Sequence, residues 1–329
     1  MTRQVHMHEP MRSTGHRLIM GCVLASAALF AHAQGFPEKT ITLVVPVSPG
    51  GATDNTARLL ATIVSKRIGQ QVVVENRPGS GGAVGLGAVA RAAPDGYTLA
   101  FTPSSSVTFL PFMTNLPFDP ARDLQPISLL AAYDMVLVAN AALPANTTKE
   151  LVDLATSKPG SIPVGITAGG ASVMMALFSK ATNTSYLKIP YKGGAPTLLA
   201  LTGGEVSLGA FDLATVLPMI ESGRIKAIGV TSLSRSAKLP NVPTIAETYP
   251  GFEMKGWFGL FAPRGTPRDR IEKLEREFAA AMQLPEVRKT VEGLTLKVVG
   301  STAAELEKTV ADEYRVFGAV IKENGIRLD

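Results

Sequence analysis

Two adjacent glycines, Gly50 and Gly51, occur where the protein backbone can hold a negatively charged ligand. They follow a short β-branched run, residues 41–47, which is typical of a buried parallel strand. A helical apolar pattern opens just after them with two cap-type residues, Thr53 and Asp54. Glycine lacks a Cβ atom, and the first N–H groups of a helix are unpaired at the positive end of its dipole. Such a turn can bind a carboxylate or a phosphate without Lys or Arg.

The same turn also has a purely structural interpretation. Strand–glycine–helix connections are common, and the glycines can serve only to make the bend. No Gly-Lys-Ser/Thr sequence follows, so the turn is not a phosphate loop of the nucleotide-binding kind. The sequence therefore leaves both an anion site and an ordinary connection open at this position.

Three more groups of polar residues follow predicted strands: serines 104–106, Tyr191 with Lys192, and Asp212. Ligands of α/β proteins bind at the carboxyl ends of such strands. Each group has a structural alternative, because the serines can satisfy their own loop, Lys192 can be a solvated surface charge, and Asp212 can be a helix N-cap. Hydroxyls, an amine and one carboxylate suit ligand binding better than catalysis.

The amino terminus has the features of a cleaved signal peptide, residues 1–33. Three arginines precede an apolar run at residues 18–31, and Ala31-His32-Ala33 matches the small-x-small cleavage pattern. Met1 and Met11 are both candidate initiators. A lipoprotein anchor at Cys22 is disfavoured because the apolar run continues past it. We therefore expect export to the periplasm.

Cleavage there would remove all four histidines and the only cysteine. The mature chain would then lack the residues for a Ser-His-Asp or Cys-His nucleophile, for a His/Cys zinc site and for disulfides. We expect no catalytic residues, no metal and no cofactor. Loss of three arginines and one glutamate lowers the formal net charge from +5 to +3, a mild bias that favours anions. Basic residues are scattered and aromatics are few, so we expect a monomer that binds no nucleic acid.

Apolar periodicity and turn residues predict alternating strands and helices. The predicted strands are 41–47, 71–75, 97–101, 127–132, 135–140, 162–167, 186–189, 206–211, 225–231 and 256–261. The predicted helices with defined bounds are 84–93, 148–157, 213–222, 267–283, 285–293 and 302–324, with capping boxes at Thr147 and Thr302. Two further helices are expected, one from the cap residues Thr53 and Asp54 to Ile68 and one that contains Met174, Met175, Leu177 and Phe178. Residues 111–123 are expected to be irregular. Glycine turns in both halves of the chain suggest two similar α/β lobes.

Several long motifs resemble the periplasmic solute-binding proteins of tripartite tricarboxylate transporters, also called Bug-type receptors. The matching segments are Pro37-x-Lys39-x-Ile41-x-Leu43-Val44-Val45-Pro46, Pro49-Gly50-Gly51-x-Thr53-Asp54, Gly69-Gln70-x-Val72-Val73-Val74-Glu75-Asn76-Arg77-Pro78-Gly79, Pro94-Asp95-Gly96-Tyr97-Thr98-Leu99, Pro190-Tyr191-Lys192-Gly193, Trp257-x-Gly259-Leu260-x-Ala262-Pro263 and Gly325-Ile326-x-Leu328-Asp329. Together they span nearly all of the expected mature chain.

The resemblance implies an α/β fold of the two-lobed periplasmic binding protein kind, type II-like. Each lobe would be a mixed sheet flanked by helices, with the ligand in the cleft between the lobes. We expect residues 34–139 and 233–329 to form lobe 1 and residues 140–232 to form lobe 2. Closure of the lobes would be a hinge motion.

The resemblance also implies where a small carboxylate binds. In lobe 1 the implied ligand-binding residues are Ser48, Gly50, Gly51, Ala52, Thr53, Asp54, Ser104 and Ser105. In lobe 2 they are Ala168, Gly169, Gly170, Ala171, Tyr191, Lys192, Gly193 and Asp212. The chain departs from the usual family pattern at residues 167–175, where it is less polar. An aromatic or short aliphatic carboxylate is therefore as compatible with the sequence as citrate.

The expected function is that of a periplasmic receptor that delivers a small organic carboxylate to membrane transporter subunits. A receptor that instead reports its ligand to a signalling protein would have the same sequence features. An exported carboxylate-based hydrolase is a weaker alternative, because it needs two acids facing each other across the cleft and no acid pair in the sequence indicates one.

Overall fold

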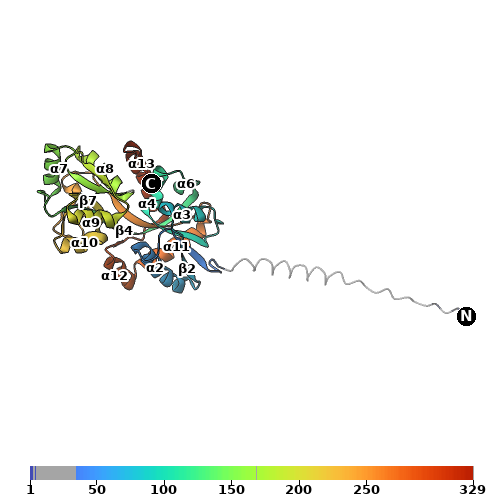
Figure 1. Ribbon diagram of the computed structural model, residues 1–329. Coiled ribbons are helices and arrows are strands. Elements are labelled where there is room, and N and C mark those ends of the chain that lie inside the picture. Colours follow the sequence, from blue (N-terminus) through green and yellow to red (C-terminus); the bar gives the residue numbers. More distant parts are fainter. Residues whose placement is uncertain (3, 5–34, 168, 329) are drawn as a thin grey trace. The chain divides into compact units, whose positions relative to one another are not determined.

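One long strand joins the two halves of a mixed sheet (Figure 1). The computed structural model describes residues 1–2, 4, 35–167 and 169–328, of which residues 39–328 belong to one compact unit. The strands in this part of the chain are β1 (Ile41–Val45), β2 (Val72–Asn76), β3 (Thr98–Pro103), β4 (Leu124–Asn140), β5 (Pro163–Ile166), β6 (Leu187–Pro190), β7 (Leu208–Asp212), β8 (Ile225–Val230), β9 (Lys255–Pro263) and β10 (Lys297–Val298). Their order is β2-β1-β3-β9-β4-β7-β5-β6, and β8 and β10 also pair with β4.

Helices surround both halves of this sheet. They are α2 (Ala52–Ile68), α3 (Ala83–Ala90), α4 (Ser104–Thr108), α5 (Leu110–Met113), α6 (Pro120–Asp123), α7 (Thr148–Ser157), α8 (Gly170–Thr182), α9 (Gly194–Gly203), α10 (Leu213–Glu221), α11 (Arg268–Met282), α12 (Pro285–Gly293) and α13 (Ala303–Glu323), with short 3-10 turns at Ser80–Gly82 and Ile245–Glu247. Figure 1 shows α7 to α10 around one half, whereas α2, α3 and α11 accompany the other.

Strand β4 defines the two halves. Its residues up to Asp134 pair with β9, and its residues from Met135 onward pair with β7 and β8. We call β1, β2, β3, β9, β10 and residues 124–134 the first half, and β5 to β8 with residues 135–140 the second half. The predicted lobe boundaries at 140 and 233 stay a prediction.

The prediction of two separate strands, 127–132 and 135–140, was wrong, because β4 is continuous between them. Polar residues at 133–134 suggested a break. Asp134 is instead buried, and its carboxylate accepts a hydrogen bond from Lys297 Nζ on β10 at 2.8 Å. A buried carboxylate with a partner can remain within a strand, and this pairing also explains β10, which the sequence did not predict.

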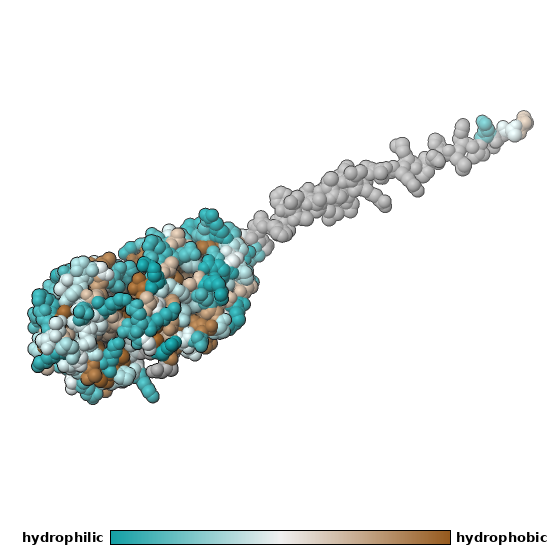
Figure 2. Space-filling model, turned by 90° about the horizontal axis from the view of Figure 1, so that it is seen from above, coloured by the Kyte–Doolittle hydropathy of each residue, from teal (hydrophilic) through white to brown (hydrophobic). Residues whose placement is uncertain are grey.

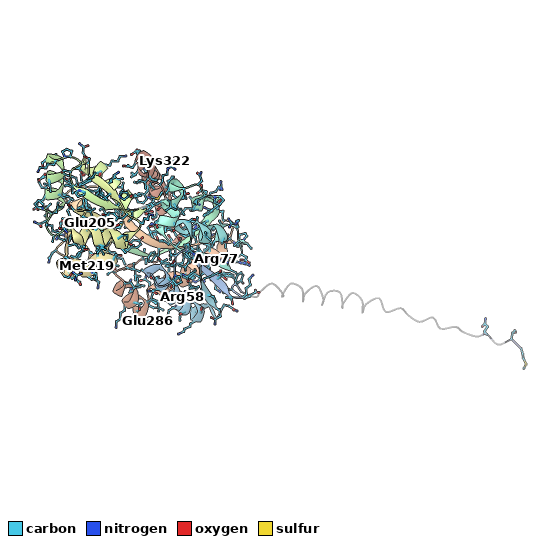
Figure 3. All side chains as sticks on the ribbon, viewed as in Figure 1. Arg58, Arg77, Glu205, Met219, Glu286 and Lys322 are labelled. Atoms are coloured by element: carbon cyan, nitrogen blue, oxygen red, sulfur yellow. The ribbon has the colours of Figure 1, made fainter. Side chains whose placement is uncertain are left out.

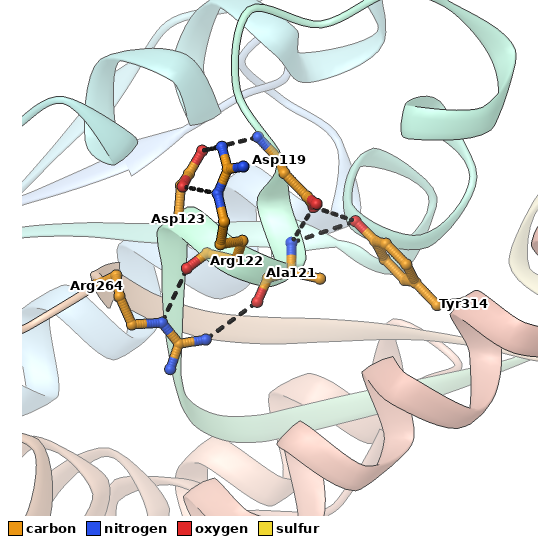
Figure 4. Close-up of polar contacts among 6 residues, drawn as sticks. All are labelled: Asp119, Ala121, Arg122, Asp123, Arg264 and Tyr314. Carbon is orange, nitrogen blue, oxygen red and sulfur yellow. Dashed lines mark hydrogen bonds and ion pairs between the residues drawn. The ribbon is translucent and has the colours of Figure 1, made fainter.

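The prediction of irregular structure at residues 111–123 was wrong in part, because α5 and α6 lie there, although residues 114–119 between them are irregular as expected. The serines 104–106, expected in a loop, lie in α4. Figure 4 shows how α6 is held. Asp119 caps α6 by accepting the N–H of Ala121 at 3.0 Å, and the hydroxyl of Tyr314 on α13 contacts both residues. Arg264, just after β9, donates to the carbonyls of Ala121 and Arg122 at 3.0 Å each. Tertiary contacts therefore hold a helix of four residues that local sequence would not sustain.

The helix ends agree in part with the sequence. Gly69 is the C-cap of α2 in the left-handed conformation, and Thr302 forms the capping box with Glu305 that the sequence predicts. At α7, Thr147 accepts the N–H of Glu150, whose carboxylate accepts the N–H of residue 146, so that capping box is incomplete. Thr53 and Asp54 were expected at the cap of α2, yet Gly51 is its N-cap and both residues lie inside the helix.

Buried apolar residues form a core on each side of β4. On α13 the side chains of Leu306, Val310 and Phe317 are buried, and Met174 and Met175 of α8 are core residues. On the face seen in Figure 2, hydrophilic residues predominate and hydrophobic residues gather in separate patches. Within the described part of the chain, no helix has both the length and the apolar character that crossing a membrane requires.

Candidate functional site

A cavity of about 340 Å³ lies where the two halves of the sheet meet, and we call it the cleft cavity. Residues from strands of both halves and from the helices that follow them line it. From the first half come Ala52, Thr53, Pro103, Ser105, Tyr133 and Phe258, from the second half Asp212, Ala214 and Thr215, and Leu296 comes from the segment after α12. Four predicted site residues therefore line one cavity: Ala52, Thr53, Ser105 and Asp212.

The amino terminus of α2 supplies unpaired backbone donors to the cleft cavity. Ala52 and Thr53 are its first two residues, and no acceptor for their N–H groups occurs among the residues that the structure describes. Gly50 has φ = +95°, a left-handed conformation that favours glycine, and Gly51 precedes the helix in extended conformation. These N–H groups lie at the positive end of a helix of 17 residues, which is suited to an anion.

Asp54 holds this turn in place by hydrogen bonds within the protein. Its carboxylate accepts the Gly50 N–H at 2.9 Å, Arg58 Nε at 3.0 Å and Asn76 Nδ2 at 2.9 Å. Asn76 also donates to the carbonyl of Val47 at 3.1 Å, which ties the turn to the ends of β1 and β2. Arg58, labelled in Figure 3, lies on α2 one turn beyond Asp54. The Gly50 N–H and both Asp54 oxygens are thus engaged within the protein.

Two opposing effects set the pKa of Asp54. Burial raises it, whereas the hydrogen bonds from Arg58, from the Gly50 N–H and from Asn76 lower it, and the result lies below the usual value. The side chain of Asp54 is 3% exposed. The turn therefore contains a buried, ionised and fully bonded carboxylate, which makes Asp54 a positioning residue for α2.

Tyr133 and Phe258 form an aromatic wall of the cleft cavity, and their ring centroids lie 5.3 Å apart. Tyr133 pairs in register with Gly256 on β9, where an added Cβ would lie 1.9 Å from the ring. Ser104 is buried behind this wall and hydrogen-bonds to Tyr133 and to the N–H of Trp257. Burial raises the pKa of Tyr133 far above its usual value, so its hydroxyl stays protonated.

Asp212 supplies the carboxylate of the cleft cavity. It is the N-cap residue of α10, yet its side chain accepts no hydrogen bond from that helix. Its environment within the cleft weakens hydration and raises its pKa to about 6, although the residue keeps access to solvent. The sequence left open whether Asp212 is an N-cap or a ligand contact, and the structure shows the cap position without the capping bond. In the described part of the chain, none of the residues that line this cavity is Lys or Arg.

The other predicted site residues do not line the cleft cavity. Tyr191 lines a second cavity of about 200 Å³ with residues 166–167, 172, 188, 190 and 324–327. Ser48, Gly50 and Gly51 are exposed at the turn before α2, and Ser104 is buried beneath it. Gly169, Gly170, Ala171, Lys192 and Gly193 line neither cavity, and Ala168 lies outside the described residues. The cleft cavity is the larger of the two and receives strand ends from both halves of the sheet.

Sequence reasoning missed six residues of the cleft cavity: Pro103, Tyr133, Ala214, Thr215, Phe258 and Leu296. Ala214 and Thr215 lie in the first turn of α10, two and three residues after Asp212, so the start of α10 was a usable signal. Tyr133 and Phe258 depend on the pairing of β4 with β9, which no local pattern reveals. Among the described residues, no group of three or more His, Cys, Asp or Glu residues could hold a metal ion.

Solved structures with the same fold define the class. The protein BugD, solved as a periplasmic binding protein, is 33% identical, with a TM-score of 0.70 over 89% of this chain and 99% of that one. An R. palustris protein solved with adipate is 31% identical, with a TM-score of 0.73 over 89% and 99%. MatC from Rhodopseudomonas palustris, solved with malate, is 30% identical, with a TM-score of 0.71 over 87% and 100%. The fold is therefore that of a two-lobed periplasmic binding protein.

The family follows from the sequence. The model for the tripartite tricarboxylate transporter family receptor matches residues 56–326. Protein BugT of Bordetella pertussis is 34% identical over 325 residues, which cover 97% of this chain and all of BugT. The chain belongs to the tripartite tricarboxylate transporter receptor family, as its motifs indicated.

Proposed function

We propose that this protein is a periplasmic receptor that binds a small organic carboxylate in the cleft cavity. The observation that carries the proposal is the pair of unpaired N–H groups of Ala52 and Thr53, which open α2 at the cavity wall. The ligand carboxylate accepts these N–H groups at the positive end of the helix. Ser105 and Asp212 contact other parts of the ligand, and Asp54 holds the turn in place.

The cavity can supply the affinity that such a receptor needs. Micromolar binding corresponds to about 8 kcal/mol. Hydrogen bonds between N–H groups and a charged carboxylate are roughly twice as strong as neutral ones. Tyr133 and Phe258 offer an apolar wall for the ligand body. Closure of the two halves would shield both interactions from water, at the entropic cost of ordering the cleft.

The relatives support this ligand class. Adipate and malate, present in two of the similar structures, are both small organic carboxylates. The family description names a transporter receptor, which supports delivery of the ligand to membrane transporter subunits. The predicted signal peptide at residues 1–33 supports the periplasm as its location.

A thermal-shift screen of the purified protein tests the proposal. The panel contains dicarboxylates and tricarboxylates, aromatic and aliphatic monocarboxylates, amino acids and inorganic phosphate. A ligand that binds only the folded protein raises its melting temperature, and the stabilisation grows with the logarithm of the ligand concentration above Kd. We expect a shift confined to one class of carboxylates. A cooperative melt that no carboxylate displaces would contradict the proposal.

Uptake measurements separate transport from sensing. Cells that lack this protein should lose uptake of the radiolabelled ligand found in the screen, and the restored gene should return it. Unchanged uptake, together with a lost transcriptional response to the same ligand, would identify a sensory receptor instead.

A further inference from the structure

The charges that line the cleft cavity are unbalanced. Asp212 is its one carboxylate, and Tyr133 is the other titratable group in the lining. The lining residues from α2, α4, α10 and β9 are uncharged, and no Lys or Arg that could neutralise Asp212 occurs among the described residues that line the cavity. The α2 terminus attracts a negative ligand group to one wall, whereas Asp212 presents negative charge from the second half of the sheet.

The carboxylate of Asp212 is available to a ligand. Its position at the start of α10 is that of a capping aspartate, but it forms no bond to the helix N–H groups. No hydrogen bond or ion pair of its side chain occurs among the residues that the structure describes. Tyr133, from β4, is the titratable group that faces it, and this partly buried phenol is neutral. Asp212 therefore keeps its acceptor capacity toward the cavity.

An acceptor in this place discriminates between ligands. A second ligand carboxylate beside Asp212 would put two like charges together, which disfavours the charged form of both and favours uptake of a proton by one of them. An ammonium or hydroxyl group would instead donate a charge-assisted hydrogen bond to Asp212. Selectivity can thus arise from repulsion of the wrong ligand as much as from attraction of the right one.

We propose that the cleft cavity selects carboxylates whose other end carries a hydrogen-bond donor, and that Asp212 is the specificity-determining residue that accepts it. This inference rests on the proposed function, because it assumes that the first carboxylate binds at α2. The donor is an ammonium or a hydroxyl group, and a second carboxylate is disfavoured. The chain would then differ in preference from the relative solved with adipate, a dicarboxylate without such a donor.

Calorimetric titration with matched probes tests this assignment. Butyrate, γ-hydroxybutyrate, γ-aminobutyrate and glutarate share one carboxylate and differ at the other end, and their longer homologues cover the span of the cavity. At neutral pH we expect the best donor-bearing probe to bind wild type about tenfold or more tighter than the matched dicarboxylate. Comparison of the amino and hydroxy probes then identifies the donor.

Substitutions of Asp212 test whether this residue causes the preference for donor-bearing ligands. Asp212→Asn should lose the preference for the amino probe over glutarate by about tenfold, whereas Asp212→Glu, which keeps the charge, should retain part of it. Glu221→Gln removes one exposed charge at the other end of α10 and should leave the ranking unchanged. Because Asp212 is exposed, these variants are expected to fold, and circular dichroism melts confirm this before titration.

The pH dependence provides a second readout. Protonation of Asp212, below its pKa of about 6, removes the negative acceptor. Binding of the amino probe to wild type should therefore weaken as the pH falls through this value, and binding to Asp212→Asn should not. We expect glutarate to bind wild type more strongly at low pH, because Asp212 and the second carboxylate of glutarate can then share a proton. Asp212→Asn should not show this change.

Two outcomes overturn the inference in distinguishable ways. If butyrate binds but a donor adds no affinity, or if glutarate binds most tightly at neutral pH and Asp212→Asn leaves the order unchanged, the specificity assignment fails and the carboxylate receptor stands. If no probe of any length binds wild type or either variant, the proposed function fails with it.

Discussion

Asp54 shows how one side chain can shape a binding turn without touching the ligand. It was predicted as a site residue, and its three hydrogen bonds connect the glycine turn, α2 and β2. The free N–H groups of Ala52 and Thr53 depend on this arrangement, because the turn sets where α2 begins. Its contribution is therefore to stability and to preorganisation.

Replacement of Asp54 by Ala should destabilise the protein by about 1–3 kcal/mol, because it removes three hydrogen bonds to a charged carboxylate, one of them from the Arg58 guanidinium. Urea unfolding followed by circular dichroism measures this change. Asp153→Ala is the matched control, since Asp153 is exposed on α7 and pairs only with Lys149. Equal stability of the two variants would contradict the role assigned to Asp54.

The same contribution should depend on pH. The pKa of folded Asp54 lies below the ordinary value of 3.8, so the folded state binds fewer protons than the unfolded state. The stabilisation is complete at neutral pH and declines as the pH falls below 3.8 toward the folded-state pKa. The difference in unfolding free energy between wild type and Asp54→Ala should shrink over this acidic range, and a constant difference would argue against it.

Gly256 gives space to the Tyr133 ring. An added Cβ would overlap this ring, so Gly256→Ala should displace Tyr133 and cost about 1–3 kcal/mol of stability through overpacking. The displaced ring would also alter the wall of the cleft cavity and weaken carboxylate binding in a titration. Gly203→Ala is the control, because a Cβ at this exposed position meets no atom within 4 Å. Wild-type stability and affinity in Gly256→Ala would refute the steric argument.

For single residues, the sequence was sufficient to identify those whose role depends on local backbone conformation. Gly50, Gly51 and the first residues of α2 are recognisable because a strand, a glycine turn and a helix follow one another directly. It could not show that Asp54 bonds within the turn, because Asn76 and Arg58 reach it only in the folded structure. It also could not separate Tyr191 from the cleft cavity, since that depends on the positions of the strand ends.

The bounds of helices and strands were also predictable only where they depend on local sequence. Long helices with a single apolar stripe, such as α11 and α13, were predicted within one or two residues. The short helices α4 to α6 and the unbroken β4 were missed, because contacts distant in sequence maintain them. Strand β4 matters most for the site, since it carries Tyr133 just before it passes from one half of the sheet to the other.

The hydroxyl of Tyr314 is one of the contacts that hold α6 (Figure 4). It accepts the N–H of Ala121 at 3.2 Å and donates to Asp119 Oδ1 at 3.3 Å. Tyr314→Phe removes both bonds and keeps the ring, so it should lower the free energy of unfolding by about 1 kcal/mol. Binding of the carboxylate should not change, because Tyr314 does not line the cleft cavity. A loss of affinity without a loss of stability would contradict this separation.

For the whole molecule, the arrangement of the cleft cavity favours binding coupled to closure. The cavity takes residues from both halves of the sheet, so a ligand that contacts α2 and Asp212 together would hold the halves in one arrangement. β4 connects the halves without a break, and a second connection runs from β8 to β9. A hinge at these connections would let the halves move as units.

The most direct test of the central claim is a calorimetric titration of the best carboxylate from the thermal-shift panel into wild type and two tryptophan variants. Ala214→Trp fills the cleft cavity from an exposed position, and Ala319→Trp adds the same side chain to an exposed position on α13 outside the described cavities. We predict that Ala214→Trp loses measurable binding while Ala319→Trp binds like wild type. Unchanged affinity in Ala214→Trp would show that the carboxylate binds elsewhere.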